Sequence, residues 1–435
     1  MFVPSLSTPF IAPLLELERR ILAAQPQIEH WFRSRWNTHA APFYGSVDLR
    51  NSGFKLAPVD MNLFPGGFNN LSPAAQPLAV QAAVSAVERV NCHAWSILLI
   101  PENHTRNTFY LQNVAALRTI LCQAGFTVRL GSLLPEVTAP TQLDCGNGDT
   151  LTVEPLVRRG RRLQVGDDFD PCIVLLNNDL SGGLPDILSG LDQTLLPPLH
   201  AGWAVRRKSH HFAAYDRVAD DFARLISIDP WLINPYFSRC EDVDFHERQG
   251  EQALADTVSD LLKRTADKYR EYGIDTQPFA IVKADAGTYG MGVMTVKTPE
   301  DVLGLNRKQR NKMAVVKEGL EVSQVIVQEG VYTFETVNDA VAEPVIYMID
   351  RSVVGGFYRV HTDRGIDENL NAPGMHFSPM CFDAACLPDM LSGPECSTNR
   401  LYAYSVVARL AHLAAAYELE DTEPTPVQAT ELQAS

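Results

Sequence analysis

A glycine-rich stretch, residues 279–296 (FAIVKADAGTYGMGVMTV), limits most strongly what this chain can fold into. An apolar run ends in Lys283, then Gly287, Gly290 and Gly292 follow, and residues 293–296 again have the composition of a β-strand. The pattern predicts a strand, a glycine loop and a second strand. Glycines let the backbone N–H groups of a loop converge on phosphate oxygens, and a nearby lysine adds a positive charge for the same oxygens.

A plain β-hairpin with a glycine-rich turn is the competing interpretation of this stretch, since such hairpins are common. The Walker pattern does not apply, because its lysine follows the last glycine, and the dinucleotide-binding pattern does not apply, because its glycines open a helix. The loop alone leaves a phosphate site and a structural turn both open.

The composition limits the class of protein and its partners. A length of 435 residues predicts two or three domains, and a net charge of −15 makes nucleic acid and anionic membranes poor partners. The apolar runs are shorter than the roughly 20 residues of a membrane span, and the N-terminus lacks the pattern of a signal peptide. Eight cysteines without a CxxC pair indicate reduced thiols and a cytoplasmic protein.

Residues 43–70 alternate apolar and polar side chains, which predicts a pair of strands. Asp60 and Asn62 are two residues apart on one strand, so they share a face, and both offer the oxygen ligands that Mg²⁺ prefers. Their apolar neighbours suggest a strand that is buried on both sides, where polar residues need a reason. A solvated face of an antiparallel strand is the alternative.

The middle of the chain alternates helical and strand patterns. Residues 74–135 and the run 172–183 predict a mostly parallel sheet. Residues 197–212 contain a dense basic cluster, which we interpret as a solvated helix face, with phosphate or carboxylate binding as the alternative. That cluster consists of Arg206, Arg207, Lys208, His210 and His211.

The order VKADAGTYGMGVM, VIVQEGV, EPVIYMIDRSVVGGFYRV and ENLNAPG resembles the ATP-grasp ligases. In that superfamily the lysine and the glycine loop hold the phosphates, a hinge strand reads adenine through its backbone, and a later strand supplies an arginine, here Arg359. An acidic E-x-N strand usually follows, but this chain has its counterpart near the N-terminus, in VDMNLFPGGFNN. That order is similar to the circularly permuted eukaryotic glutathione synthetases. The resemblance implies an α/β, ATP-grasp-like, circularly permuted fold with a mobile β–loop–β–α–β lid and an additional parallel α/β domain.

Over residues 10–417 the chain more specifically resembles the proteobacterial glutamate–cysteine ligase family, through MNLFPGGFNNL, VKADAGTYGMGVMTV and IDRSVVGGFYRVHTDRGIDENLNAPGMHFSP. The resemblance implies ATP-dependent joining of the γ-carboxylate of L-glutamate to the amine of L-cysteine through a γ-glutamyl phosphate, as in the first step of glutathione biosynthesis. ATP and Mg²⁺ are the implied cofactors. Asp60 stands where the related motif has a glutamate, which shortens its reach to a metal.

The resemblance also implies a set of site residues. The catalytic residues are Arg359, Lys283 and Arg50. The ATP-binding residues are Lys283, Gly287, Tyr289, Gly290, Gly292, Gln328, Glu329 and Val331. The substrate-binding residues are Arg50, Ser52, Asn69, Asn70, Arg359, Asn369 and Asn371. The metal ligands are Asp60, Asn62 and Asp285.

We expect six segments. They are residues 1–72 (an N-terminal helix and the substrate and metal strands of the ligase core), 73–200 (an α/β substrate domain), 201–275 (the helical part of the core), 276–331 (the lid), 332–417 (the core and a substrate loop) and 418–435 (a disordered tail).

Other functions stay open at this point. They are another ATP-grasp amino-acid or peptide ligase such as a glutathione synthetase, a small-molecule kinase, and a non-catalytic nucleotide- or metal-binding module. His376, Cys381, Cys386 and Cys396 could form a zinc site, but their spacing matches no standard pattern. The expected partners are the small-molecule substrates glutamate, cysteine and ATP, with no nucleic acid and no membrane, and a homo-oligomer is possible.

Overall fold

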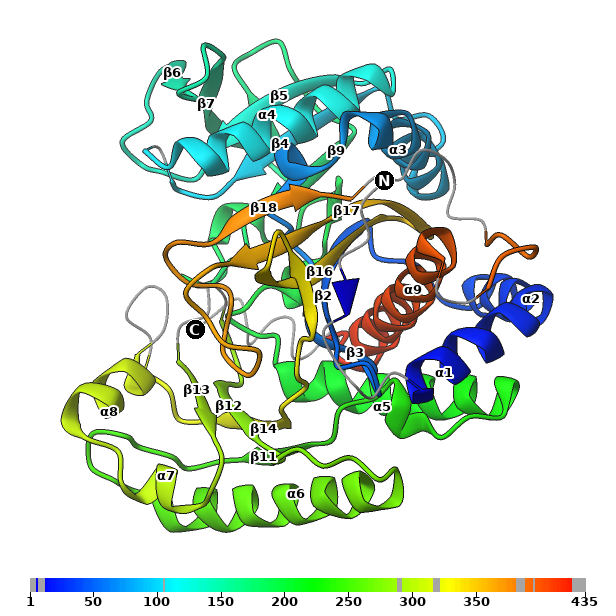
Figure 1. Ribbon diagram of the computed structural model, residues 1–435. Coiled ribbons are helices and arrows are strands. Elements are labelled where there is room, and N and C mark those ends of the chain that lie inside the picture. The colour runs from blue at the N-terminus through cyan, green and yellow to red at the C-terminus, as the bar shows by residue number, and fades with distance from the viewer. Residues whose placement is uncertain are drawn as a thin grey trace.

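The structure, a computed structural model of the chain, describes residues 5–6, 12–104, 106–287, 292–315, 321–380, 388–393 and 396–424. These residues form three β-sheets with helices packed around them (Figure 1). In that view an α/β sheet lies at the top, a central sheet in the middle and the sheet that carries the glycine loop at the bottom left. The predicted mixed α/β fold is confirmed.

The central sheet joins distant parts of the chain. β2 (Tyr44–Asn51) pairs antiparallel with β3 (Leu56–Asn62) and with β16 (Ala340–Ile349), which forms a hairpin with β17 (Ser352–His361). Short strands complete the sheet: β1 (Ser5–Leu6), β15 (Glu335–Val337) and β18 (His376–Pro379). The strand pair predicted in residues 43–70 is therefore present, and it pairs with the β16–β17 hairpin.

The α/β sheet is parallel along most of its width. Its parallel strands are, in spatial order, β10 (Thr194–Leu196), β9 (Ile173–Asn177), β4 (Ser96–Pro101), β5 (Thr127–Ser132) and β7 (Thr150–Arg159). Of these, β4, β5 and β9 lie in the segments for which the sequence predicted a parallel sheet, whereas β7 and β10 were not predicted. β6 (Thr141–Asp144) and β8 (Arg162–Val165) pair antiparallel with β7.

Two helices pack with this sheet, α3 (Gln76–Val90) and α4 (Thr108–Gln123). Asn107 caps α4 by accepting a hydrogen bond from the backbone N–H of Tyr110, and Gly125, at a φ of 95°, follows its end. α3 also packs against β16 and β17, so it connects the α/β sheet with the central sheet.

The glycine-loop sheet is antiparallel throughout. Its strands, in spatial order, are β11 (Phe237–Cys240), β14 (Val325–Glu329), β12 (Ala280–Ala284) and β13 (Val293–Val296). Its helices are α6 (Glu251–Glu271), α7 (Glu300–Leu303) and α8 (Arg307–Ala314). The single helix that the resemblance implies for the lid, residues 276–331, is thus two short helices.

The glycine-loop sheet has an apolar core of its own. Val258 and Leu261 of α6 pack with Val282, Val296 and Val327 of the sheet. The sequence assigned α6 to the core segment 201–275, whereas the structure packs it on the sheet that carries the glycine loop. Burial of these side chains favours that position.

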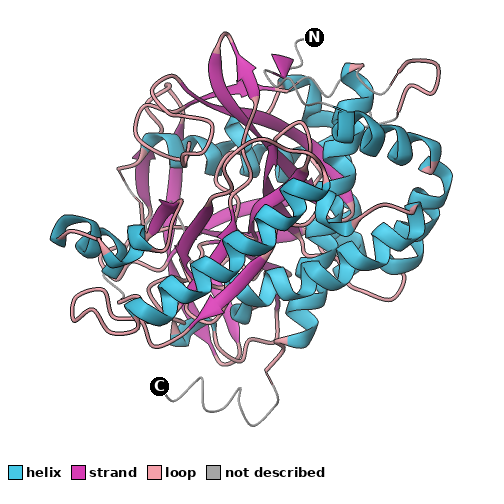
Figure 2. Cartoon of the chain, turned by 60° about the horizontal axis from the view of Figure 1, so that its bottom comes forward, coloured by secondary structure: helices cyan, strands magenta, loops and turns pink. Residues whose placement is uncertain are grey.

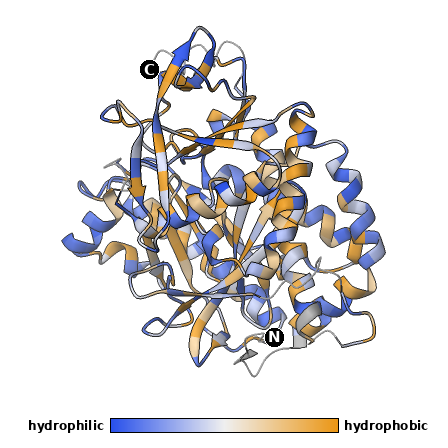
Figure 3. Ribbon diagram, turned by 90° about the horizontal axis from the view of Figure 1, so that it is seen from above, coloured by the Kyte–Doolittle hydropathy of each residue, from blue (hydrophilic) through white to orange (hydrophobic). Residues whose placement is uncertain are grey.

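The remaining helices enclose the central sheet. They are α1 (Ala12–Ala23), α2 (Gln25–Trp36), α5 (Lys208–Ile226) and α9 (Ser397–Asp421). Figure 2 shows helices lying across the strands, and Figure 3 shows hydrophobic and hydrophilic stripes along the helices. α9 packs against α5, β2, β3 and β16. Among the described residues, no helix is long and apolar enough to span a membrane.

The start of the predicted disordered tail needs correction. α9 continues to Asp421, and Glu418 is buried in an ion pair with Arg206. The disordered tail was predicted from composition, and composition alone cannot reveal an ion-pair partner more than 200 positions away. Residues 425–435 lie outside the described part of the chain.

Candidate active site

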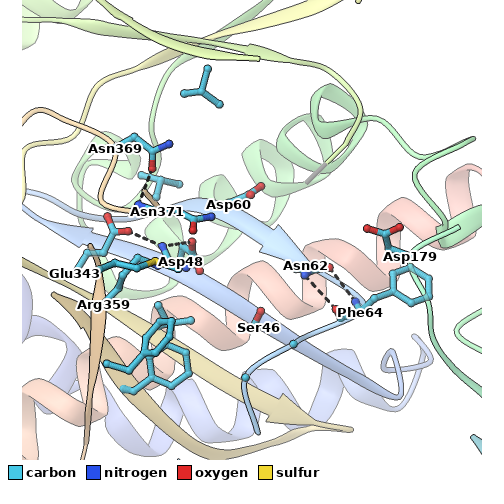
Figure 4. A pocket seen from close by; sticks show the side chains of 18 of the residues that line it. Ser46, Asp48, Asp60, Asn62, Phe64, Asp179, Glu343, Arg359, Asn369 and Asn371 are labelled. Atoms are coloured by element: carbon cyan, nitrogen blue, oxygen red, sulfur yellow. Dashed lines mark hydrogen bonds and ion pairs between the residues drawn. The ribbon is translucent and has the colours of Figure 1, made fainter. Parts of the chain in front are cut away.

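A cavity of about 750 Å³ lies where the three sheets meet. Its walls come from β2 and β3, from β12 and β14 of the glycine-loop sheet, from β16 and β17, and from the ends of β4 and β9. Figure 4 shows side chains of β2, β3 and β17 pointing toward this space. The cavity is therefore built by segments that are far apart in the sequence.

The β2–β3 hairpin supplies one wall. The Cα atoms of Asp48 and Asp60 are partners across the two strands, and Ser46 pairs in the same way with Asn62. Alternation along a strand turns these side chains to one face, the cavity side. Asn62 also closes a local turn, because its Oδ1 accepts from the backbone N–H of Phe64 at 2.9 Å.

Two arginines and two carboxylates form a continuous row beside this hairpin. Arg359 Nη1 donates to Asp48 Oδ2 at 2.7 Å and to Glu343 Oε1 at 2.6 Å, and Arg50 Nε donates to Glu343 Oε2 at 2.9 Å. Burial would raise the pKa of Glu343, but Arg50 and Arg359 outweigh burial and lower it. The carboxylate thus stays ionised and holds both guanidinium groups at the cavity.

Two lysines flank Asp60. Lys208 Nζ donates to Asp60 Oδ1 at 2.7 Å and lies 4.5 Å from the ring centroid of Trp203. Lys283 Nζ donates to the carbonyl of Val59 and to Gln328 Oε1, each at 2.7 Å. Burial would raise the pKa of Asp60, but Lys208 and Lys283 lower it. Burial also lowers the pKa of Lys283 to about 8.

The end of β14 and the residues that follow it approach the cavity closely. Gln328 and Glu329 of β14 line the cavity, as does Val331, and Gly330 follows Glu329 directly. A Cβ atom at Gly330 would lie 2.2 Å from the ring of Phe279, so only glycine fits there without a shift of that ring. The backbone N–H of Gly330 donates to the carbonyl of Phe279 at 2.8 Å, which fixes the segment against β12.

Some polar atoms at the cavity have no hydrogen-bond partner within the described residues. They include Arg359 Nε, Gln328 Nε2 and Asn69 Oδ1, all of them buried atoms. A buried polar atom without a partner is costly, and one that lines a cavity is suited to a ligand.

Most of the predicted site residues line this one cavity. They are Arg50, Asp60, Asn62, Asn69, Asn70, Lys283, Gly287, Gln328, Glu329, Val331, Arg359, Asn369 and Asn371. Tyr289 and Gly290 lie outside the described residues, as do Cys381 and Cys386 of the considered zinc site. His376 lines the cavity from β18.

The other predicted site residues lie away from the cavity wall. Ser52 is buried in the turn between β2 and β3, where its Oγ donates to the carbonyl of Lys55 at 3.2 Å. Gly292 is buried, and its carbonyl accepts from the backbone N–H of Ala284 at 2.9 Å. Both residues hold backbone turns in place.

Asp285 caps α5 from outside that helix. Its Oδ1 accepts from the backbone N–H of Ser209 at 2.7 Å, and its Oδ2 accepts from Ser209 Oγ at 2.7 Å. Asp285 is fully buried, and its carboxylate satisfies an N–H group at the helix N-terminus. The structure thus brings Asp60 and Asn62 to the cavity but not Asp285.

Sequence reasoning missed three charged groups of the site: Asp48, Lys208 and Glu343. For Lys208 a signal existed, because the basic cluster after residue 205 was noticed, but its interpretation as a solvated helix face is wrong for the buried Arg206, Lys208 and His211. Arg206 donates to the carbonyl of Met61 at 2.9 Å, and Lys208 pairs with Asp60, so both side chains contact β3.

A divalent cation partly fits the predicted ligands. Asp60 has a side chain that is 39% exposed toward the cavity, and the amide oxygen of Asn62 retains a second lone pair. Asp48 lies opposite Asp60 and completes a set of oxygen atoms on one wall. The described residues contain no group of three or more His, Cys, Asp or Glu that could hold a metal alone. Any ion here would need oxygens from a substrate.

The comparisons with known proteins agree with this geometry. The family model of glutamate-cysteine ligases matches residues 18–419. A crystal structure from Methylobacillus flagellatus KT, of a protein provisionally described as a gamma-glutamylcysteine synthetase, is 64% identical, with a TM-score of 0.91 over 97% of this chain and 100% of that chain. No curated protein matches the chain.

Two other solved structures are distant. A glutathione synthetase-like effector from Globodera pallida is 10% identical, with a TM-score of 0.36 over 86% of this chain and 84% of that chain. D-alanyl-alanine synthetase A from Vibrio cholerae O1 biovar eltor is 10% identical, with a TM-score of 0.35 over 73% and 81%. TM-scores this low do not establish a shared fold. The match of the family model over residues 18–419 shows that this chain belongs to the glutamate-cysteine ligase family.

Proposed function

We propose that this protein joins the γ-carboxylate of L-glutamate to the amine of L-cysteine, with ATP converted to ADP and phosphate. The observation that carries the proposal is the convergence of Lys208, Lys283, Arg50 and Arg359 on one cavity. The ammonium and guanidinium groups of these four residues suit the oxygens of a polyphosphate and a carboxylate. Family membership supports the same reaction.

ATP binds between the glycine-loop sheet and the β2–β3 hairpin. The base lies against the backbone of the segment after β14, and the phosphates extend toward Lys283, Lys208 and the start of the glycine loop at Gly287. The orphan donor of Gln328 lies beside Lys283 and supports this orientation. The arrangement also supports a circularly permuted ATP-grasp core in which the glycine-loop sheet acts as a mobile lid.

The γ-carboxylate of glutamate and the transferred phosphoryl group lie near Arg359 and Arg50. A guanidinium holds such groups through two parallel hydrogen bonds, and Arg359 Nε is a buried donor without a partner among the described residues. The remaining polar atoms of the two amino acids meet the amide side chains on the rim. These are Asn69, Asn70, Asn369 and Asn371.

Mg²⁺ would be held by Asp60 and Asn62 together with phosphate oxygens, with Asp48 close by. The ion would neutralise charge on the triphosphate, which Asp60 would otherwise repel. The lysine partners of Asp60 serve the same purpose, because they bring positive charge to the place where the phosphates lie.

The chemistry needs positioning and charge stabilisation rather than a protein nucleophile. A γ-carboxylate oxygen attacks the terminal phosphorus of ATP, and the bond to ADP breaks. The amine of cysteine then attacks the carbonyl carbon of the γ-glutamyl phosphate, the C–O bond to phosphate breaks, and the amine loses a proton to solvent. Lys283, Lys208 and Arg359 stabilise the negative charge on the oxygens that change partners.

Product analysis tests the proposal. With ATP, glutamate and cysteine, we expect ADP, phosphate and γ-glutamylcysteine in equal amounts. A kinase would leave a stable phosphorylated product without a new amide, and a glutathione synthetase would require γ-glutamylcysteine and glycine instead. Either result would overturn the proposal.

A further inference from the structure

A buried ion pair lies directly behind the segment that we propose for the adenine. Lys55 Nζ donates to Glu329 Oε2 at 2.8 Å, and both side chains are only 1% exposed. Lys55 belongs to the turn between β2 and β3, whereas Glu329 ends β14. The proposed reaction uses neither charge, and Lys55 does not line the cavity.

The Glu329 carboxylate has further donors besides Lys55. Trp231 Nε1 donates to Oε1 at 3.0 Å and to Oε2 at 3.2 Å, and the backbone N–H of Tyr236 donates to Oε2 at 2.9 Å. The Lys55 ammonium also lies 4.4 Å from the ring centroid of Trp231. This set of partners fixes the side chain in the interior, so Glu329 presents only its backbone to the cavity.

The same hairpin contacts the following residues as well. Arg50 Nη1 donates to the carbonyl of Val331 at 3.2 Å, and the backbone N–H of Phe334 donates to the carbonyl of Asn51 at 2.9 Å. The β2–β3 hairpin therefore holds the segment after β14 at several points. It also carries Asp48 and Asp60, which lie at the proposed phosphate end of the cavity.

A buried ion pair usually adds little net stability compared with an apolar pair of the same shape, so its presence here calls for another reason. Burial lowers the pKa of Lys55 to about 8, so its ammonium is protonated at neutral pH and the pair is ionised. In some proteins a buried pair of this kind specifies one register between two segments.

We infer that Lys55 is a positioning residue for the nucleotide: by holding Glu329 in the interior, it sets the distance between the backbone that binds the base and the hairpin that binds the phosphates. This inference rests on the proposed function. Glu329 then contributes to ATP binding through its backbone alone. Without Lys55, the Glu329 carboxylate can move toward the cavity. The backbone that binds the base and the hairpin that binds the phosphates are then no longer held at the distance that ATP requires.

The test compares two variants that each break a buried ion pair. Lys55→Met removes the proposed positioning contact. Arg400→Met is the matched control, because Arg400 pairs with Glu18 between α9 and α1, at 6% and 1% exposure, away from the cavity. Binding of ATP is measured by titration calorimetry, and kinetics give the KM values of ATP, glutamate and cysteine.

We expect both variants to lower the melting temperature, but only Lys55→Met to weaken ATP binding, by about tenfold or more as for the loss of a charged contact. The KM of glutamate should change little. An ATP affinity of Lys55→Met within about twofold of the wild type would overturn the inference, since a merely structural pair would affect stability alone.

A milder variant covers the case in which Lys55→Met does not fold. Trp231→Phe keeps an aromatic ring at this position but removes the Nε1–H donor to Glu329. It should weaken ATP binding severalfold, and unchanged binding in this folded variant would overturn the inference. A wild-type protein that binds no ATP would instead reject the proposed function, so the two failures are distinguishable.

Discussion

Lys208 Nζ lies 2.7 Å from Asp60 Oδ1, although 148 positions separate the two residues in the sequence. The contact joins the first turn of α5 to β3, and both side chains line the cavity. It places a cation next to the carboxylate that we propose for the metal. Lys208 is therefore ready to bind phosphate oxygens together with Lys283.

Replacement of Lys208 by methionine should weaken ATP binding by about 10- to 100-fold, because a charged hydrogen bond contributes about 1.5–3 kcal/mol. Titration calorimetry with ATP measures the change. Lys263→Met is the control, since Lys263 lies on α6 with a side chain that is 74% exposed. Equal affinities of Lys208→Met and the wild type would rule out a phosphate contact.

The charge of Lys283 predicts how ATP binding depends on pH. Burial lowers the pKa of Lys283 to about 8, so the ammonium group loses its proton as the pH rises through this value. ATP affinity should fall above about pH 8, and Lys283→Ala should bind ATP weakly at every pH.

Lys283→Arg provides the control for this pH dependence. A guanidinium stays charged across the range, so the fall in affinity should move to higher pH in this variant. The pKa of Lys55 is also about 8. If the ATP affinity of Lys283→Arg fell at the same pH as that of the wild type, the effect would belong to Lys55 instead.

The geometry of Arg359 predicts a loss of activity without a loss of charge. Lysine at this position cannot bridge Asp48 and Glu343 and also offer the Nε donor, because its ammonium is a compact point charge. Arg359→Lys should lower kcat/KM for glutamate by about 10- to 100-fold while the protein stays folded. Steady-state kinetics and circular dichroism measure both. Full activity with glutamate would refute the assignment.

Local patterns in the sequence revealed much of this site. Lys283 and Gly287, the β2–β3 hairpin and the end of β14 each follow from a short run of residues, and the structure brings them together. The basic cluster marked Lys208 as a candidate, but no local pattern could show that Lys208 contacts Asp60 or that Asp285 contacts α5, because both contacts join distant segments. Residue type alone suggested a metal ligand at Asp285, whereas packing makes it a helix cap.

The role of Glu418 also depends on a contact with a distant segment, and this contact predicts an effect on the free energy of unfolding. Arg206 Nε donates to its Oε1 at 2.7 Å and Arg206 Nη2 donates to its Oε2 at 2.9 Å. Burial would raise the pKa of Glu418, but Arg206 and His211 lower it to about 2 from 4.5. The carboxylate therefore stabilises the fold above pH 4.5, and this contribution is lost as the pH falls toward 2.

Glu418→Gln should lower the free energy of unfolding at neutral pH by about 3–5 kcal/mol, because it leaves Arg206 buried without its partner charge. The difference in the free energy of unfolding between Glu418→Gln and the wild type should become smaller as the pH falls below 4.5. Urea unfolding at several pH values measures it. Glu420→Gln is the control, since Glu420 lies on the same helix with a side chain that is 43% exposed. Equal destabilisation by both variants would contradict the prediction.

Asp60 and Asp285 were predicted as ligands of the same ion, but their contacts predict opposite responses to Mg²⁺. Asp60 faces the cavity, so Asp60→Asn should raise the Mg²⁺ concentration needed for half-maximal activity, by about tenfold for the loss of one charged contact, and should lower turnover. Asp285→Ala removes the cap of α5, so it should lower the free energy of unfolding by about 0.5–2 kcal/mol and leave the Mg²⁺ dependence unchanged. Titration of activity with Mg²⁺ and thermal unfolding, carried out on both variants, separate the two roles. If Asp60→Asn only lowered the melting temperature, the metal role of Asp60 would be wrong. If Asp285→Ala shifted the Mg²⁺ dependence, a purely structural role of Asp285 would be wrong.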